Sequence, residues 1–319
     1  MTQIKDSGED YYKPGTELLA AINTALLLKR PLLLAGEPGT GKTDCAEYIA
    51  RELNRAQSKR FRSDRALRFN IKSVSQSTDL FYYYDAVSHF GDKTGKEKEH
   101  FISFNALGLA LLRTLPVDES LSRFRNYQKE VAAINPPYGS VVLLDEIDKA
   151  PRDFPNDLLA ELEKPPFKFS IRELSDLEFK QSTEDIVVVI TSNNEKGLPD
   201  AFLRRCIFHY IDFPSPTRLR EIVASKPIYT EMNGGEKKGL ENAIAAFLLL
   251  RDNEALNKRP ATSELIDWIV CLKEKQLLEV VTGDLKDIDP AYRDILRETV
   301  GVLGKSRSDN EILSRKISG

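Results

Sequence analysis

The chain has 319 residues and a formal net charge of −3, and 41% of its residues are hydrophobic while 30% are charged. This balance is typical of a globular protein with one large and one small domain, and it gives no general reason to expect nucleic acid as the main partner. The three cysteines form no CxxC pair and the longest apolar runs are too short to span a bilayer, so we expect a cytoplasmic protein without disulfides, a cysteine zinc site or a membrane segment.

The first predicted elements are a helix over 16–30, a strand and a second helix. The stretch "RPLLLAG", 30–36, has the continuous apolar character of a buried parallel strand. The second helix covers 43–54, where apolar residues recur at helical spacing. Its buried face is expected to contain Cys45, Ala46, Ile49, Ala50 and Leu53.

The loop between this strand and helix reads "GEPGTGKT" and fits the pattern G-x-x-x-x-G-K-[ST]. Its glycines let the backbone turn closely, so that N–H groups point at a ligand beside the positive end of a helix. Lys42 adds a cation for the β- and γ-phosphates, and Thr43 offers a hydroxyl to Mg²⁺. We therefore predict that a nucleotide and Mg²⁺ bind here, with contacts from Gly36, Glu37, Pro38, Gly39, Thr40, Gly41, Lys42, Thr43 and Asp44.

Four less specific stretches follow. Residues 54–68 are basic; we interpret them as a solvated helix end and loop, with a DNA-binding surface as the alternative. A short strand, "ALRFN", ends at Asn70. Residues 91–100 form a charged loop that is expected to be exposed, and 104–115 are apolar enough for a helix or a buried segment.

The stretch "GSVVLLDEIDKAP" predicts a buried strand, 141–144, that ends in two carboxylates. Side chains just past the carboxyl end of a parallel strand face the ligand crevice. Asp145 is therefore expected to hold Mg²⁺ through its waters, and Glu146 to polarise the attacking water. The alternative is a strand that ends in a solvated acidic turn.

A third strand, in "EDIVVVITSNNEKG", ends in the polar residues Thr191, Ser192, Asn193 and Asn194. A neutral amide here can hydrogen-bond the attacking water or the γ-phosphate without adding charge. The alternative is an Asx turn that closes the strand.

These three strands, in this order, resemble those of the AAA+ ATPases. "GEPGTGKT" is similar to Walker A, "VVLLDEIDKA" to Walker B, "VVVITSNNE" to the sensor 1 strand, and "LPDAFLRRC" to the segment that carries an arginine finger. Within AAA+ the chain resembles the MoxR family, which has an insert in its second helix. That insert would begin in "FNIKSVSQSTDLFYYYDAV", and 158–181 resemble the helix and β-hairpin before sensor 1. The resemblance covers residues 11–270.

The resemblance implies an α/β fold: a P-loop NTPase AAA+ core, in which helices flank a parallel sheet, followed by a small α-helical lid domain. Pro214 and Pro216 mark the expected break, which gives a nucleotide-binding domain over 1–213 and a lid over 214–319. The polar tail, 304–319, is expected to be disordered or weakly helical.

The resemblance also implies roles for single residues. Asn193 matches the sensor 1 amide, with Asn194 as the alternative, and Arg205 matches the finger arginine, with Arg204 as the alternative. Asn70 matches a polar residue that contacts and gates the Walker B glutamate in many relatives.

The lid departs from the family pattern. The family's sensor 2 arginine would fall near Ala261, so Arg259 or Lys258 would have to replace it from just before the helix. Coupling between lid and nucleotide is therefore an open question at this point.

The function that the resemblance implies is ATP hydrolysis in a ring, expected to be a hexamer, in which Arg205 enters the neighbouring copy's site. MoxR proteins commonly act as chaperones or remodelling motors, often with a client protein that carries a von Willebrand factor A domain. Two alternatives remain: a nucleotide-gated signalling or defence switch with slow turnover, and a DNA-acting motor.

Overall fold

The computed structural model describes residue 4 and residues 12–116, 121, 123–124, 137–162, 165–182, 185–193 and 197–318. By their internal contacts the residues form two compact units. The first consists of Met1–Asp10, Pro14–Gly36 and Lys42–Ile211, and the second of Tyr11–Lys13, Glu37–Gly41 and Asp212–Gly319. Within the described part of the chain, no helix combines the length and apolar character that crossing a membrane requires.

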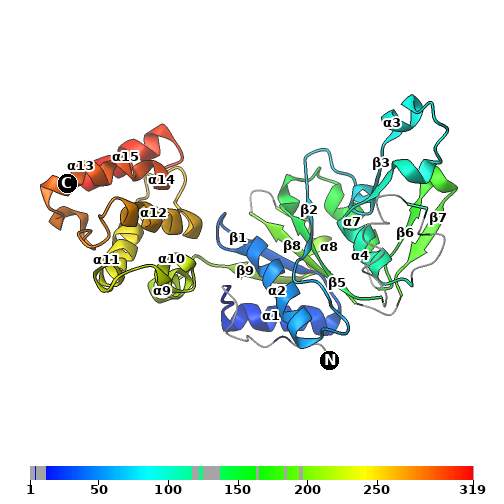
Figure 1. Ribbon diagram of the computed structural model, residues 1–319, viewed down its shortest axis with the longest axis horizontal. Helices are drawn as coiled ribbons and strands as arrows, with labels where there is room; N and C mark the ends of the chain where they lie inside the picture. Colours follow the sequence, from blue (N-terminus) through cyan, green and yellow to red (C-terminus); the bar gives the residue numbers. More distant parts are fainter. Residues whose placement is uncertain are drawn as a thin grey trace. The chain divides into compact units, whose positions relative to one another are not determined.

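A five-stranded parallel sheet forms the centre of the first unit, with the strand order β2-β5-β8-β1-β9. The three central strands are almost wholly buried, as their continuous apolar runs predict for a sheet covered on both faces. The prediction of a parallel sheet flanked by helices is confirmed (Figure 1). The strands are β1 (Leu32–Gly36), β2 (Leu67–Asn70), β5 (Ser140–Asp145), β8 (Ile186–Ser192) and β9 (Ile207–Ile211).

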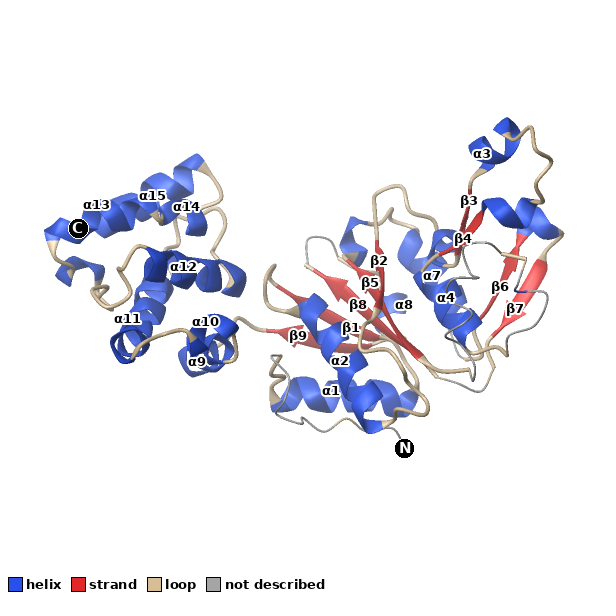
Figure 2. Ribbon diagram, in the orientation of Figure 1, coloured by secondary structure: helices blue, strands red, loops and turns tan. Residues whose placement is uncertain are grey.

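Helices cover both faces of this sheet. Successive strand residues point to opposite faces, and alternate residues such as Val142, Leu144 and Val188 belong to one buried cluster with side chains from α4 and α7. Figure 2 shows α1 and α2 lying over the other face. The expected buried face of α2 is confirmed, because all five predicted residues are buried. The helices are α1 (Thr16–Leu28), α2 (Lys42–Ala56), α4 (Ala106–Arg113) and α7 (Phe154–Leu162).

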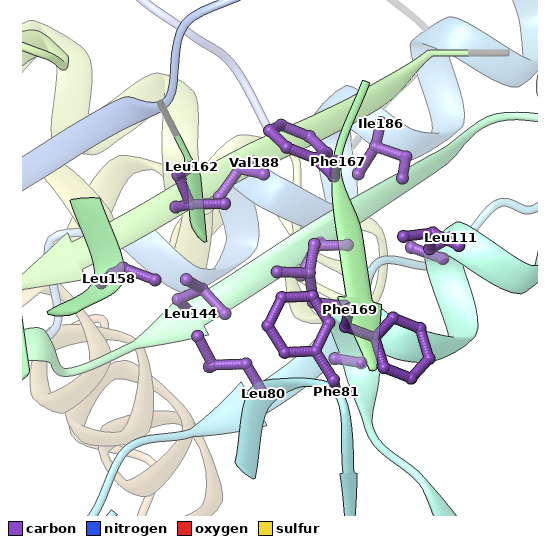
Figure 3. Close-up of a cluster of buried hydrophobic side chains, with 14 of the residues drawn as sticks. Leu80, Phe81, Leu111, Leu144, Leu158, Leu162, Phe167, Phe169, Ile186 and Val188 are labelled. Carbon is purple, nitrogen blue, oxygen red and sulfur yellow. The ribbon is translucent and has the colours of Figure 1, made fainter. Parts of the chain in front are cut away.

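Two insertions extend this core. The first lies between β2 and β5, and the second is the hairpin β6–β7 between α7 and β8, as the resemblance implied. Phe167 and Phe169 of the hairpin segment and Phe81 of the first insertion pack together over Leu144 and Val188 of the sheet (Figure 3). The elements are η1 (Ser77–Leu80), β3 (Tyr82–Tyr84), α3 (Ala86–Gly91), η2 (Lys98–Phe101), β4 (Ile102–Phe104), η3 (Ile147–Lys149), β6 (Lys168–Ile171), η4 (Arg172–Leu174), β7 (Leu177–Lys180) and α8 (Asp200–Leu203).

The second unit is helical. Its core surrounds Trp268, which is fully buried and donates its indole N–H to Thr299 Oγ1 at 2.8 Å. The first of these helices begins at Pro216, after Ser215 has capped it by accepting the N–H of Arg218. The helices are α9 (Pro216–Ala224), α10 (Pro227–Thr230), α11 (Gly234–Arg251), α12 (Thr262–Glu274), η5 (Leu285–Asp287), α13 (Pro290–Glu298), α14 (Val300–Leu303) and α15 (Arg307–Ser318).

The expectation of a disordered or weakly helical tail is wrong, because residues 307–318 form the packed helix α15. Leu313 and Ile317, one helical turn apart, are both buried in the core of the second unit. Asp309 is also buried, and it accepts the backbone N–H of Asn257 at 2.8 Å. Ile312 also packs against this core, so three apolar residues dock a helix whose other residues are mainly polar.

Candidate active site

The glycine loop after β1 has a backbone that L side chains rarely adopt. Gly36, Gly39 and Gly41 have φ values of 154°, 74° and 87°. A Cβ at Gly39 would lie 2.7 Å from Ala261 Cβ, both within the second unit, so this glycine is also required by its neighbours. Lys42, which begins α2 and is 6% exposed, donates to the carbonyl oxygen of Gly36 at 2.8 Å. The lysine is therefore held at the base of the loop, where the motif predicts phosphate.

The carboxylate of Asp145 is the centre of a group of polar side chains at the carboxyl edge of the sheet. Asp145 is 4% exposed and accepts the hydroxyls of Thr191 at 2.5 Å and Thr43 at 3.3 Å. Thr191 Oγ1 in turn accepts the backbone N–H of Glu146 at 2.9 Å. The structure thus brings together residues from α2, β5 and β8, which the sequence places far apart.

These residues fit a magnesium ion that is shared with a nucleotide. Mg²⁺ prefers oxygen ligands and is usually bound by one or two protein groups together with phosphates and waters. Thr43 and Asp145 supply such oxygens side by side. Among the described residues there is no cluster of three or more His, Cys, Asp or Glu side chains that could hold a metal ion.

Glu146 occupies a strained position next to this group. Its φ and ψ are 61° and 56°, the left-handed region that non-glycine residues seldom adopt and that recurs at functional sites. Its carboxylate accepts the side-chain amide of Asn193 at 3.4 Å and forms an ion pair with Lys149 at 2.5 Å. Asn193 is positioned by its own backbone N–H, which donates to Asp148 at 3.2 Å. Asn194, the alternative to Asn193, lies outside the described residues.

A cleft of about 550 Å³ lies beside Glu146. Its lining includes Arg68 and Asn70 from β2 and Asp148 from η3. Asn70 is paired in register with Asp145, so the structure places it at the same edge of the sheet as Glu146. The sequence reasoning missed Arg68, although residues two apart on a strand share a face and Asn70 had been singled out.

Arg204 and Arg205 lie at the amino ends of the parallel strands, opposite to the carboxyl ends where Asp145 is found. Both are exposed, and they follow α8 directly before β9. β9 is parallel to β1, with Ile207 beside Leu32 and Ile211 beside Gly36, so the two arginines are at the amino end of the strands. The strand spans 5 residues, about 17 Å at the usual rise, which exceeds the reach of an arginine side chain. Neither arginine can therefore reach Lys42, which follows Gly36, and Asp145 lies three strands away from β9, on β5.

The sequence reasoning also missed the residue that holds the arginine pair in place. The guanidinium of Arg30 donates to the backbone carbonyl oxygens of both Arg204 and Arg205, the latter at 3.0 Å. Arg30 lies two residues before the start of β1, and the Ile207 N–H donates to the carbonyl oxygen of Pro31. The backbone of the pair is thus fixed to the sheet while the arginine side chains are exposed.

In the second unit, the cation that contacts the glycine loop is Arg251, at the end of α11. Arg251 is 4% exposed, lies 3.5 Å from the ring centroid of Phe213, donates to the carbonyl oxygen of Pro260 and forms an ion pair with Glu37 at 2.5 Å. The two sequence candidates for a lid cation, Lys258 and Arg259, are exposed. The sequence signal that could have identified Arg251 is its position as a charged residue directly after the apolar run "AIAAFLLL".

The start of α12 is held by Glu264, near Gly39. Burial raises the pKa of Glu264, but hydrogen bonds from Ser263 and from the Ala261 N–H outweigh burial, so the pKa lies below its ordinary value. The ionised carboxylate accepts Ala261 N–H at 3.1 Å and Ser263 Oγ at 2.9 Å, and so caps the helix.

The Glu37–Arg251 pair gives a prediction about stability. In Glu37→Gln the nearly buried guanidinium loses its carboxylate, so we expect the second unit to lose about 2–3 kcal/mol of stability, below the range for fully buried pairs because Glu37 is half exposed. The sole tryptophan, Trp268, is in this unit, so urea unfolding followed by its fluorescence measures the effect. The double variant Glu37→Gln/Arg251→Met should cost less than the sum of the single ones.

The matched control is Glu254→Gln, which makes the same chemical change at an exposed position of this unit. It should shift the urea midpoint little. Equal midpoints for Glu37→Gln and the parent, or strict additivity in the double variant, would contradict an energetic role for the ion pair.

Comparison with known proteins agrees with this geometry. The family model described as "ATPase family associated with various cellular activities (AAA)" matches residues 32–215, which is more than half of the chain and runs from β1 to just past β9. No curated protein matches the chain. The chain therefore belongs to the AAA family of ATPases.

Proposed function

We propose that the chain binds ATP together with Mg²⁺ and hydrolyses it at the carboxyl edge of its sheet. The observation that carries this proposal is the arrangement of Thr43, Asp145, Glu146 and Asn193. They lie on or directly after α2, β5 and β8 and form one hydrogen-bonded network with Thr191. A glycine turn alone could form a similar loop, but it would not place a metal ligand, a base and an amide beside it.

Each side chain has a distinct role in this proposal. The N–H groups of the glycine loop and the cation of Lys42 bind the phosphates. Glu146 takes the proton from the attacking water, and the Asn193 amide orients that water or the γ-phosphate. Thr43 and Asp145 would hold Mg²⁺, which when bound neutralises charge on the β- and γ-phosphate oxygens. The hydrogen bond of 3.4 Å from the Asn193 amide to the Glu146 carboxylate supports these two roles.

The experiment that tests nucleotide binding is the substitution Lys42→Ala. We expect ATP affinity to fall at least about 100-fold, because charge-assisted bonds to phosphate are among the strongest polar contacts. Calorimetry with ATP and Mg²⁺ measures this change. Lys59→Ala, which removes an exposed lysine, is the control. Unchanged affinity in Lys42→Ala would remove the nucleotide assignment.

We further propose that the chain works as a homo-oligomer, expected to be a hexameric ring. The support is the position of Arg205 at the amino edge of the sheet, where it cannot serve its own site. In a head-to-tail ring each copy presents one surface to the next, so an exposed arginine of one copy can meet the nucleotide of its neighbour. An arginine supplied in this way accelerates phosphoryl transfer by about 10³–10⁵ in related systems.

Within the AAA family we propose a MoxR-type chaperone or remodelling motor that acts on a client protein, such as one with a von Willebrand factor A domain. The support is the insertion between β2 and β5 and the hairpin β6–β7 before β8, which are the two additions that the resemblance implied. A Glu146→Gln variant that retains ATP should co-purify with such a client, and identification of that protein would test this part.

A nucleotide-gated signalling or defence switch with slow ATP turnover is a second candidate function, and one observation favours it. The carboxylate of the proposed base, Glu146, forms an ion pair with Lys149 at 2.5 Å, so it is engaged by a cation that a water would have to displace. Turnover near zero with strong ATP-dependent assembly would select this function over a motor.

The DNA-acting alternative receives less support from the structure. Several cations of the basic stretch 54–68 are engaged within the protein: Arg55 with Glu52, Arg60 with Asp185, and Arg68 with Asp145. They do not present a continuous stripe for phosphates. A salt-dependent DNA-binding assay would test this alternative directly.

A further inference from the structure

The contacts of Asp145 include one cation that the proposed reaction does not use. Arg68 Nη2 lies 2.5 Å from Asp145 Oδ2, while the donors from Thr43 and Thr191 are neutral hydroxyls. A nearly buried carboxylate is costly to desolvate unless a cation or several donors compensate it. Arg68 therefore supplies the positive charge that faces this carboxylate.

Arg68 can move more easily than Asp145. It lies on β2, at the edge of the sheet, and its side chain is 50% exposed, against 5% for Asp145. It also lines the cleft of about 550 Å³ that contains Glu146 and Asp148. The guanidinium thus has both solvent and other carboxylates available when it leaves Asp145.

We propose that Arg68 is a positioning residue that competes with Mg²⁺ for Asp145, so that the metal–nucleotide complex binds only as Arg68 leaves this carboxylate. This inference rests on the proposed function, in which Thr43 and Asp145 hold the metal. Two cations that contact the same carboxylate repel each other strongly when water is partly excluded. Arg68 then sets the Mg²⁺ concentration that nucleotide binding requires, and it couples metal binding to the cleft beside Glu146.

The test is the dependence of nucleotide affinity on Mg²⁺ in Arg68→Met, measured with a fluorescent ATP analogue and without reference to hydrolysis. We expect the Mg²⁺ concentration for half-maximal affinity to fall about fivefold, the factor for the upper range of a partly exposed ion pair. Arg65→Met removes the same charge at an exposed position three residues away and should leave this concentration nearly unchanged. Arg68→Lys, which keeps a cation, should stay close to the parent.

Two further measurements separate the explanations. In an Asp145→Asn background, Arg68→Met should no longer shift the Mg²⁺ requirement, because the shared carboxylate is absent. With EDTA, affinity for the metal-free nucleotide should change equally in Arg68→Met and Arg65→Met; a loss of tenfold or more in Arg68→Met alone would show that Arg68 binds phosphate instead and would overturn the inference. An unshifted or raised Mg²⁺ requirement would overturn it too. A parent protein that binds no nucleotide at any Mg²⁺ concentration would instead overturn the proposed function.

Discussion

Replacing Glu146 with glutamine is expected to lower the rate of ATP hydrolysis by about 10²–10⁴ while leaving ATP affinity within a few-fold of the parent. The amide keeps the size of the side chain and can still bond Asn193, but it cannot take a proton from water. The carboxylate of Glu146 bonds Asn193 and Lys149, which the proposal does not use to bind phosphate, so phosphate binding should persist. Phosphate release in the steady state gives the rate, and calorimetry gives the affinity.

The control for this variant is Asp153→Asn, which makes the equivalent carboxylate-to-amide change at an exposed position after the same strand. Its rate should equal that of the parent. If Glu146→Gln hydrolyses ATP as fast as the parent, Glu146 is not the base. If it loses ATP affinity as well as rate, its role is structural, as the strained backbone at this position would then suggest.

The sequence was sufficient for the features that local chemistry determines. Buried parallel strands are continuous apolar runs, and polar residues at their carboxyl ends must meet at one edge of the sheet. The same rule predicts that Asp145 and Asn193 lie at one edge of the sheet. In the structure Asn193 bonds Glu146, which directly follows Asp145, and Asp148. The glycines of the loop were equally predictable, because their positive φ values follow from the motif.

The features that were missed depend on contacts between residues far apart in the chain. Arg251 is 214 positions from Glu37, and no periodicity links the two. Arg30 bonds the backbone of Arg205, which has no sequence signature at all. The polar composition of the tail predicted disorder or weak helicity, yet Ile312, Leu313 and Ile317 pack α15 against the core of the second unit. In each case the tertiary contact outweighs what composition or spacing indicates.

Loss of Arg205 is expected to have the other large effect, and it should be repairable in trans. Arg205→Ala should lower hydrolysis about 10³-fold or more, since a planar guanidinium stabilises the developing γ-phosphate charge better than other side chains. Its exposed position at the amino edge of the sheet, with a backbone fixed by Arg30, makes the parent residue available to a neighbouring copy. Arg204→Ala is the companion variant, because the structure places both arginines at this edge.

Mixing Arg205→Ala subunits with Lys42→Ala subunits should therefore restore activity that neither has alone. In a head-to-tail ring mixed at random, about one quarter of the interfaces combine a sound nucleotide site with an intact arginine, so about a quarter of the parent rate is the upper limit. Mixing Lys42→Ala with Glu146→Gln is the control and should restore nothing, because both changes damage the same half of the interface. A protein that stays monomeric in light scattering with ATP, ADP or neither, and that recovers no activity on mixing, would show that the site is not shared between copies.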